Sequence, residues 1–273
     1  MDKNPPKILA VLVNYGTEQI HFLEQVVTEL KSFSKYNVTV IVNSNINLNI
    51  DEIDKVNIFK LDNYQLLPLT CRKVIWNNKN DYDIFLFGEN DHLFKEIHID
   101  NHLKYSKILP KNRISGLIQF EEDNSGKYYP GYHADFEWKF NSVEEYDGKK
   151  FAHFTNLHQA TFILTKEQLK KIGKKLNFNE LVDENKKNTV FINKLKKILG
   201  LKIERPNKYS VKCKVNTDIY KYAGITKMIC ISEFEDNLIH HLPNIYINGN
   251  NGRNKLRSDD IRMKESLNKL LKK

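Results

Sequence analysis

The chain has 273 residues, of which 40% are hydrophobic and 11% aromatic. It is therefore long enough to bury a substantial core and too apolar for a disordered protein. The formal net charge of +9 favours an anionic partner, such as a nucleotide, a nucleic acid or an acidic membrane surface, without choosing among them.

The positions of the cysteines and the lengths of the apolar runs exclude several classes of protein. Cys71, Cys213 and Cys230 are far apart and form no CxxC pair, which argues against a zinc ribbon or a redox motif. No stretch approaches 18 consecutive apolar residues, so we expect no membrane-spanning helix. The first residues lack the apolar core of a secretory signal, and we expect a cytoplasmic protein.

The first ninety residues alternate between apolar runs and amphipathic segments. We expect strands at 7–14, 38–42, 56–61 and 84–87, and helices at 17–33 and 69–77. Buried strands that alternate with helices are typical of a mainly parallel sheet with right-handed crossovers. Polar residues that follow such strands gather at one edge of the sheet, where open α/β sheets bind ligands.

The second half is less regular. Thr165 and Gln168 form a capping-box pattern that predicts the start of a helix. We also expect strands at 114–120, 161–164 and 225–231, and a structured loop or hairpin at 121–146. A polar insertion is expected at 177–188 and a short basic helix at 190–199. The Lys-rich tail at 253–273 is expected to have a helical face that carries Met263, Leu267, Leu270 and Leu271.

The strand expected at 84–87 ends in an acidic tip, Glu89-Asn90-Asp91. Oxygen ligands of this kind suit Mg²⁺ or Mn²⁺, which commonly bridge a protein carboxylate to substrate phosphates. The Asn14-Tyr15-Gly16-Thr17 turn is neither a dinucleotide fingerprint nor a P-loop, so a bound nucleotide would need a metal at the tip. The alternative is an ordinary polar turn. Asp91 is the best ligand candidate, and Glu89 would point the same way if strand geometry continued.

Three further groups can carry chemistry. One of His240 and His241 can complete the coordination of Mn²⁺, since side chains diverge in an extended segment; the alternative is a partly exposed pair. Arg72 and Lys73 can contact a diphosphate or face solvent. Residues 128–138 combine aromatic rings with Asp135 and Glu137, which suits sugar stacking and a general base, or loop packing. We interpret His92, His98 and His102 as surface residues.

Taken in order, these segments resemble the GT-A type of nucleotide-sugar-dependent glycosyltransferases. The resemblance covers about residues 7–247 and involves Asn14-Tyr15, Asn43-Ser44, the helix at 69–73, the strand and acidic tip at 81–91, the strand at 113–120, the strand and helix at 158–169, and the segment at 235–244. The tip looks like the family's Asp-x-Asp motif, with Glu89 in place of the first aspartate.

The resemblance implies a Rossmann-type, mainly parallel mixed sheet flanked by helices. It implies one catalytic domain over residues 1–250, with a nucleotide-binding half at about 1–110, an acceptor-side half at about 111–250 and a basic helical tail at 251–273. The implied reaction transfers a sugar from a nucleoside diphosphate sugar to a hydroxyl of a glycan, lipid or protein, with Mn²⁺ or Mg²⁺. The implied roles are metal binding by Asp91 and His241 or His240, donor binding by Asn14, Tyr15, Asn43, Arg72 and Glu89, and general base for one of Asp135, Glu137 and Asp236.

Two other functions stay open. A Mg²⁺-dependent nucleotidyltransferase would need two metal-binding acids in close register, which Glu89 and Asp91 supply only loosely. A non-enzymatic module could bind nucleic acid or anionic membrane through the basic segments at 166–175, 194–202 and 264–273. Charge runs are usually solvated helix faces, and no nucleic-acid motif is present. For the tail we expect peripheral contact with anionic lipid.

Overall fold

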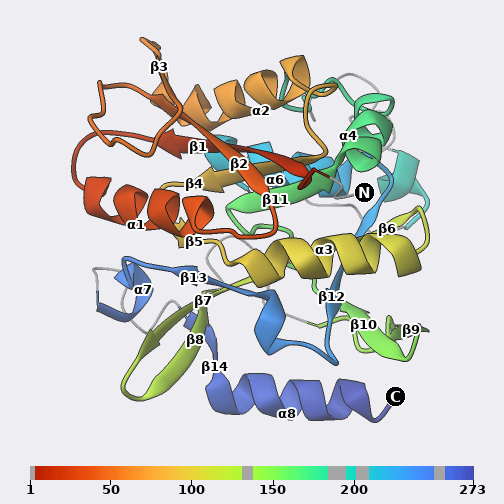
Figure 1. The fold of residues 1–273 in the computed structure, drawn as a ribbon. Helices are drawn as coiled ribbons and strands as arrows, with labels where there is room; N and C mark the ends of the chain where they lie inside the picture. Colours follow the sequence, from red (N-terminus) through yellow and green to blue (C-terminus); the bar gives the residue numbers. More distant parts are fainter. Residues whose placement is uncertain (1–3, 131–137, 184–194, 201–208, 249–255) are drawn as a thin grey trace.

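The computed structural model describes residues 4–130, 138–183, 195–200, 209–248 and 256–273, and it is an α/β structure. A five-stranded central sheet has the order β11-β4-β1-β2-β3 (Figure 1). Its first four strands along the chain are parallel and β11 is antiparallel. The strands are β1 (Lys7–Asn14), β2 (Asn37–Ser44), β3 (Lys55–Ile58), β4 (Ile84–Glu89) and β11 (Thr161–Thr165).

Helices cover both faces of the central sheet because β1 and β4 are buried on both sides. Alternate residues of β1 point to opposite faces: Ile8 packs toward one helical layer and Leu9 toward the other. One layer contains α1 (Ile20–Lys31) and α3 (Glu96–Ile108), and the other contains α2 (Leu67–Asn77), α4 (Lys166–Gly173) and α6 (Val211–Lys221).

Two smaller sheets lie beyond α3 (Figure 1). One has the order β5-β13-β7-β8-β14 and the other β6-β12-β10-β9. Their strands are β5 (His92–Leu93), β6 (Arg113–Ser115), β7 (Ile118–Asp123), β8 (Gly126–Pro130), β9 (Glu144–Tyr146), β10 (Lys149–His153), β12 (Thr226–Cys230), β13 (Leu238–His241) and β14 (Leu256–Asp259). Short helical turns are η1 (Tyr64–Leu66), η2 (Glu235–Asn237) and α7 (Ile245–Asn248).

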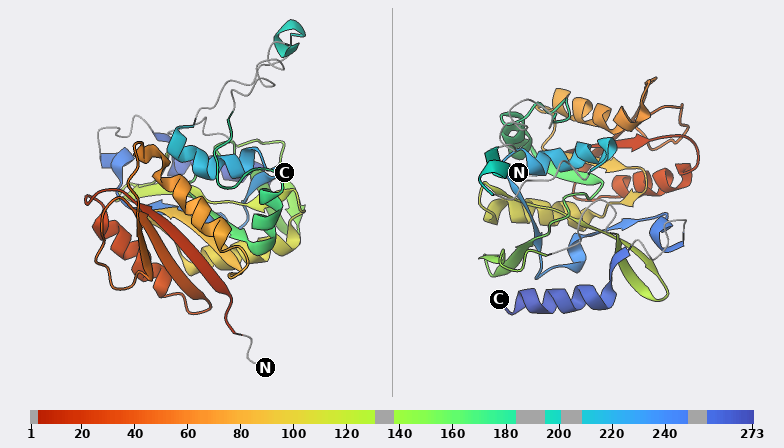
Figure 2. Two further views of the ribbon diagram at one scale, coloured as in Figure 1. Left: turned by 90° about the horizontal axis from the view of Figure 1, so that it is seen from above. Right: turned by 180° about the vertical axis from the view of Figure 1, so that it is seen from behind.

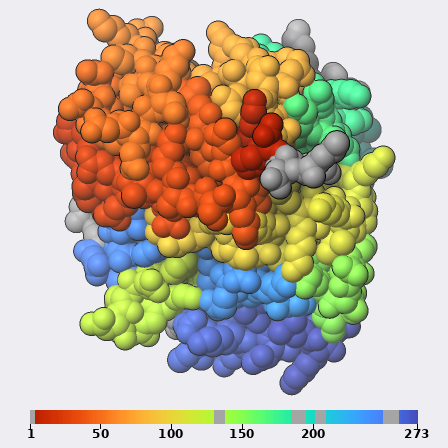
Figure 3. Space-filling model, in the orientation of Figure 1, coloured from red at the N-terminus to blue at the C-terminus, as the bar shows by residue number. Residues whose placement is uncertain are grey.

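The C-terminal segment is part of this second region. Its strand β14 pairs with β8, and α8 (Asp260–Leu271) buries Met263, Leu267 and Leu270 in a core shared with residues such as Ile118. The space-filling view shows α8 lying along the lower edge of the body (Figure 3). The predicted helical face is therefore confirmed except for Leu271, which is 38% exposed. None of the described helices has the length and apolarity needed to cross a bilayer.

The four predicted parallel strands and the capping box of α4 are confirmed. Helix α1 starts at Ile20 rather than at 17, because the Gly16 amide donates to Asn45 Oδ1 and holds the preceding turn at the sheet edge. The single strand expected at 114–120 is wrong: the chain changes sheets at Gly116. A Cβ there would lie 2.5 Å from the Lys227 side chain, so only glycine fits this crossing.

Helix α6 was not predicted from the sequence, because the polar residues Asn216, Thr217 and Asp218 are buried beside Val215 and Ile219 and interrupt the apolar pattern of the helix. The expected helix at 190–199 is helical over residues 195–198, and its earlier residues lie outside the described part. The insertion at 177–188 has no helix or strand over 177–183, the portion that the structure describes.

Candidate functional site

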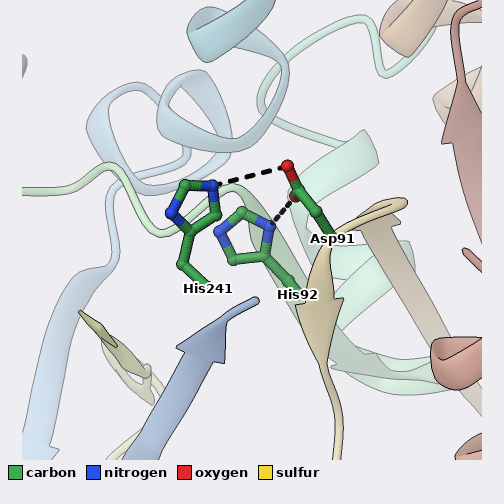
Figure 4. Close-up of side chains that lie close together, drawn as sticks. All are labelled: Asp91, His92 and His241. Carbon is green, nitrogen blue, oxygen red and sulfur yellow. Dashed lines mark ion pairs between the residues drawn. The ribbon is translucent and has the colours of Figure 1, made fainter. Parts of the chain in front are cut away.

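Strand pairing brings three metal-ligand residues together just beyond the end of β4. The chain turns at Asn90-Asp91 and enters β5, where His92 pairs directly with His241 of the antiparallel strand β13. Residues opposite each other in such a pair have Cβ atoms about 5 Å apart. The two imidazole rings accordingly lie 4.8 Å apart, and Asp91 completes the cluster (Figure 4).

The three side chains converge on one point. Their potential ligand atoms all lie within 4.8 Å of one another. Asp91 Oδ1 is 2.6 Å from His92 Nδ1, and Asp91 Oδ2 is 3.4 Å from His241 Nε2. All three residues are buried, with exposures of 6% or less, so the cluster lies in a medium where charges interact strongly.

The charges of the cluster depend on one another. Burial opposes ionisation of Asp91, but the neighbouring imidazoles outweigh it and hold the pKa of Asp91 well below its ordinary value. Burial likewise opposes protonation of His241, but hydrogen bonds to the carboxylates of Asp91 and Glu121 outweigh it and raise the pKa of His241 to about 9. In the metal-free protein at neutral pH, His241 is thus a cation between two anions. A metal ion would take the place of its Nε2 proton.

The donor set fits a transition-metal ion. Asp91 Oδ1 and His92 Nδ1 are buried and close, yet their angles do not suit a hydrogen bond, so both atoms lack a hydrogen-bond partner. Buried polar atoms without partners are unusual and mark places where an ion can bind. Two imidazoles and one carboxylate suit Mn²⁺, Fe²⁺ or Zn²⁺ better than Mg²⁺, which prefers oxygen ligands.

Glu121 holds His241 in place and was not identified from the sequence. The parallel pairing of β13 with β7 puts His240 opposite Phe120, so the next residues, His241 and Glu121, point to the other face. Glu121 is fully buried, and its Oε1 accepts from His241 Nδ1 at 2.6 Å. Its Oε2 accepts from the backbone amides of Tyr246 and Ile247, at 3.1 and 3.0 Å. Histidine ligands of metals commonly have such a carboxylate partner, which fixes the ring and its tautomer.

A pocket of about 480 Å³ opens at the carboxyl ends of β1 and β4. The chain runs from β1 to β2 and β3 on one side and then returns to place β4 on the other side of β1, so the pocket lies at the switch point where open α/β sheets bind ligands. It is lined by Val13, Tyr15, Glu18, Gln19, Asn63, Tyr64, Gln65, Leu67, Pro68, Glu89, Asn90 and Lys212.

The pocket offers aromatic, amide and charged groups. Tyr15 is 62% exposed, and its ring lies 5.2 Å from the ring of Tyr64. Lys212 comes from the first turn of α6, the helix that sequence patterning missed. Glu89 lines the pocket, whereas Asp91 is buried in the histidine cluster. The chain turn after β4 therefore separates the two acids, contrary to the expectation that they point the same way.

Buried amides make the link between the pocket and the cluster rigid. Asn90 Nδ2 donates to Asn14 Oδ1 at 2.8 Å, and Asn14 Nδ2 donates to the carbonyl of Gly16 at 3.0 Å. Asn14 is buried, with 1% exposure, and its hydrogen bond to Gly16 holds the turn that carries Tyr15. Asn43 is also buried; it donates to Thr70 Oγ1 and accepts from Asn57, which leaves it away from the pocket surface.

Arg72 is in the core, which contradicts both interpretations of it. It is fully buried, and its Nε and Nη2 donate to the carbonyls of Phe178 and Asn177, at 2.6 and 3.2 Å. Its guanidinium also lies over the Phe178 ring. Burial lowers the pKa of Arg72 to about 10, with the charge of Asp218 acting in the opposite direction. Arg72 thus anchors the segment at 177–178 and does not line the pocket.

His240 stacks on Phe120, with ring centroids 4.8 Å apart, and faces away from the cluster, as expected for adjacent residues in a strand. Asp236 is exposed on η2 and does not line the pocket. Asp135 and Glu137 lie outside the described residues.

The interpretation of three histidines as surface residues is wrong. His92 belongs to the cluster, and His98 and His102 are 3% and 4% exposed on α3. Their partners come from distant parts of the chain: His98 Nε2 donates to the Leu238 carbonyl, and His102 contacts Ser115 and Gln168. The i, i+4 spacing of His98 and His102 predicts that both side chains lie on the same face of the helix, but it does not predict whether that face is buried.

Comparisons with known proteins identify no family. No family model matches the chain, and no curated protein is significantly similar to it in sequence. The functional interpretation therefore depends on the pocket and on the buried cluster.

Proposed function

We propose that this protein is a metal-dependent glycosyltransferase that uses a nucleoside diphosphate sugar. The observation that supports this most is the juxtaposition along one chain turn: Glu89 and Asn90 line the switch-point pocket, and the next residue, Asp91, belongs to the Asp91-His92-His241 cluster. A nucleotide in the pocket would thus lie beside a site for the cation that its diphosphate requires.

The pocket's own side chains suit the donor nucleotide. The rings of Tyr15 and Tyr64 can stack on a nucleobase or a sugar face. Glu18 and Glu89 can accept hydrogen bonds from hydroxyl groups, and Lys212 can balance phosphate charge. The absence of a Gly-rich phosphate loop after β1 leaves that charge to Lys212 and to the neighbouring cation.

The cluster's residues determine which cation fits. Asp91, His92 and His241 would hold a borderline ion, and the donor set favours Mn²⁺ over Mg²⁺. When bound, such an ion supplies electrostatic stabilisation of the leaving diphosphate. Glu121 keeps the Nδ1 side of His241 occupied, so that Nε2 faces the ion. The general base stays a prediction for Asp135 or Glu137, since Asp236 is exposed and outside the pocket.

Release of nucleoside diphosphate from a panel of nucleotide sugars tests the proposal. We expect release with Mn²⁺ for a subset of uridine or guanosine diphosphate sugars, and its loss in Asp91→Asn, which keeps the side-chain size. Asp147→Asn is the matched control, because Asp147 is exposed with a φ of 50° that asparagine also adopts readily. Thermal stabilisation by nucleoside triphosphates alone, with no release from any nucleotide sugar, would instead support nucleotidyl transfer.

A further inference from the structure

An exposed apolar ridge lies on the short helix at residues 195–198 and the residue after it. Leu195, Ile198 and Leu199 are 42%, 81% and 64% exposed. Their i, i+3, i+4 spacing puts them on one face. Single exposed apolar residues are ordinary, but three on one short face mark an interaction surface. Figure 2 shows this helix standing away from the central sheet.

The charge around the ridge indicates what it contacts. Residues 194–202 contain four lysines and no acidic residue, and Lys196 and Lys197 lie beside the ridge. The same segment contains no aromatic residue and no arginine. Base stacking and protein hot spots depend largely on those residue types. Lysines beside aliphatic residues are instead typical of segments that bind in the interface of an anionic bilayer.

We propose that the segment at 195–200 docks the protein onto an anionic lipid surface. From the sequence we expected this lipid contact at the C-terminal tail. In the structure, however, the apolar face of α8 formed by Met263, Leu267 and Leu270 packs into the core. The tail therefore offers lysines without a free apolar ridge, whereas 195–200 offers both. This inference goes beyond glycosyl transfer and does not depend on it.

Vesicle co-sedimentation of the full chain tests the docking surface. With vesicles of equal parts phosphatidylglycerol and phosphatidylcholine we expect binding that weakens with salt, and little binding to phosphatidylcholine alone. The triple change Leu195→Ser, Ile198→Ser and Leu199→Ser should weaken binding at least tenfold. Ile261→Ser is the matched control, since Ile261 is 71% exposed on α8, and it should bind within twofold of the wild type.

The charge contribution is tested separately. Each lysine near an anionic surface contributes about fivefold to partitioning, so Lys196→Glu with Lys197→Glu should reduce binding by at least twentyfold. The pair Lys269→Glu and Lys272→Glu on the tail makes the same change in net charge and should have a much smaller effect. Equal losses from the two pairs, or wild-type binding by the triple serine variant, would overturn the proposal.

A probe in the ridge reports insertion directly. The native cysteines are all buried, so a polarity-sensitive dye can be attached at Ile198→Cys. We expect its emission to shift to the blue on anionic vesicles, while the same dye at Ile261→Cys does not shift. An unshifted dye at 198 would overturn the proposal. So would binding to RNA in place of vesicles, or a dimer in light scattering that the triple serine variant abolishes.

Discussion

Two buried histidines on α3 should make the protein sensitive to mild acid. His98 Nδ1 accepts from the Lys95 amide at 3.1 Å, so its proton is on Nε2, which donates to the Leu238 carbonyl at 2.9 Å. His102 likewise has one ring nitrogen beside Gln168 and the other beside Ser115. Leu238 begins β13, the strand that carries His241. Protonation of His98 would therefore disturb an anchor of the candidate metal site.

The expected loss of stability follows from the two pKa values. Burial lowers the pKa of His98 and of His102 to about 4, from an ordinary 6.5. Between these values the unfolded chain binds a proton that the folded chain excludes, so stability is full above pH 6.5 and falls toward pH 4. At pH 5 each histidine should reduce the free energy of unfolding by about 2 kcal/mol relative to pH 7.

Urea unfolding at pH 7 and at pH 5 measures this loss. His98→Asn keeps an acceptor where Nδ1 lies and removes the titrating group. Its stability difference between the two pH values should be about 2 kcal/mol smaller than that of the wild type. His21→Asn is the control, because His21 is exposed, and it should retain the wild-type difference.

Equal losses of stability on acidification in His98→Asn and the wild type would show that His98 is not the source of the acid sensitivity. Should the variant not fold, nitrogen NMR of the wild-type imidazoles gives the answer instead. Ring nitrogens of His98 and His102 that titrate above pH 6 would refute the neutral, buried state assigned to them.

Three further predictions concern single side chains. Glu121→Gln should weaken Mn²⁺ binding tenfold to hundredfold in a calorimetric titration, because His241 loses the carboxylate that orients it; unchanged affinity would show that Glu121 has no such role. Arg72→Met should lower the free energy of unfolding by about 2 kcal/mol, since buried carbonyls lose their donor. Its nucleotide affinity should be unchanged, and a tenfold loss of affinity would restore Arg72 as a donor ligand. Gly88→Ala should cost about 1 to 3 kcal/mol in urea unfolding, because its Cβ would lie 2.6 Å from the Phe94 ring; a stability equal to the wild type would refute this close contact.

The first half of the fold was predictable because β1 and β4 are apolar runs buried on both faces and β2 is largely apolar. The apolar run at 84–87 predicts a buried strand. Asn14 and Asp91 could be predicted as site residues because they lie at the carboxyl ends of two such strands. The pairing of β5 with β13 could not be predicted, because β5 has only two residues and no periodicity. For that reason His92 was missed. Glu121 was missed because its partner His241 lies on β13, 120 residues away along the chain.

Arg72 shows a different limit of the sequence. A charged residue on an amphipathic helix is ordinarily solvent-facing, and only the tertiary structure places two backbone carbonyls where they accept hydrogen bonds from its Nε and Nη2. The same applies to His98 and His102, whose partners at Leu238 and Gln168 lie at least 66 residues away.

A crystal soaked with Mn²⁺ and a nucleoside diphosphate would show whether the cluster and the pocket form one metal-nucleotide site. We predict an anomalous peak at coordination distance from Asp91, His92 and His241, with the nucleotide in the pocket between Tyr15 and Glu89. A nucleotide bound in that pocket with no ion at the cluster, or an ion held away from Asp91, would show that the cluster is not the metal site of a nucleotide-sugar transferase.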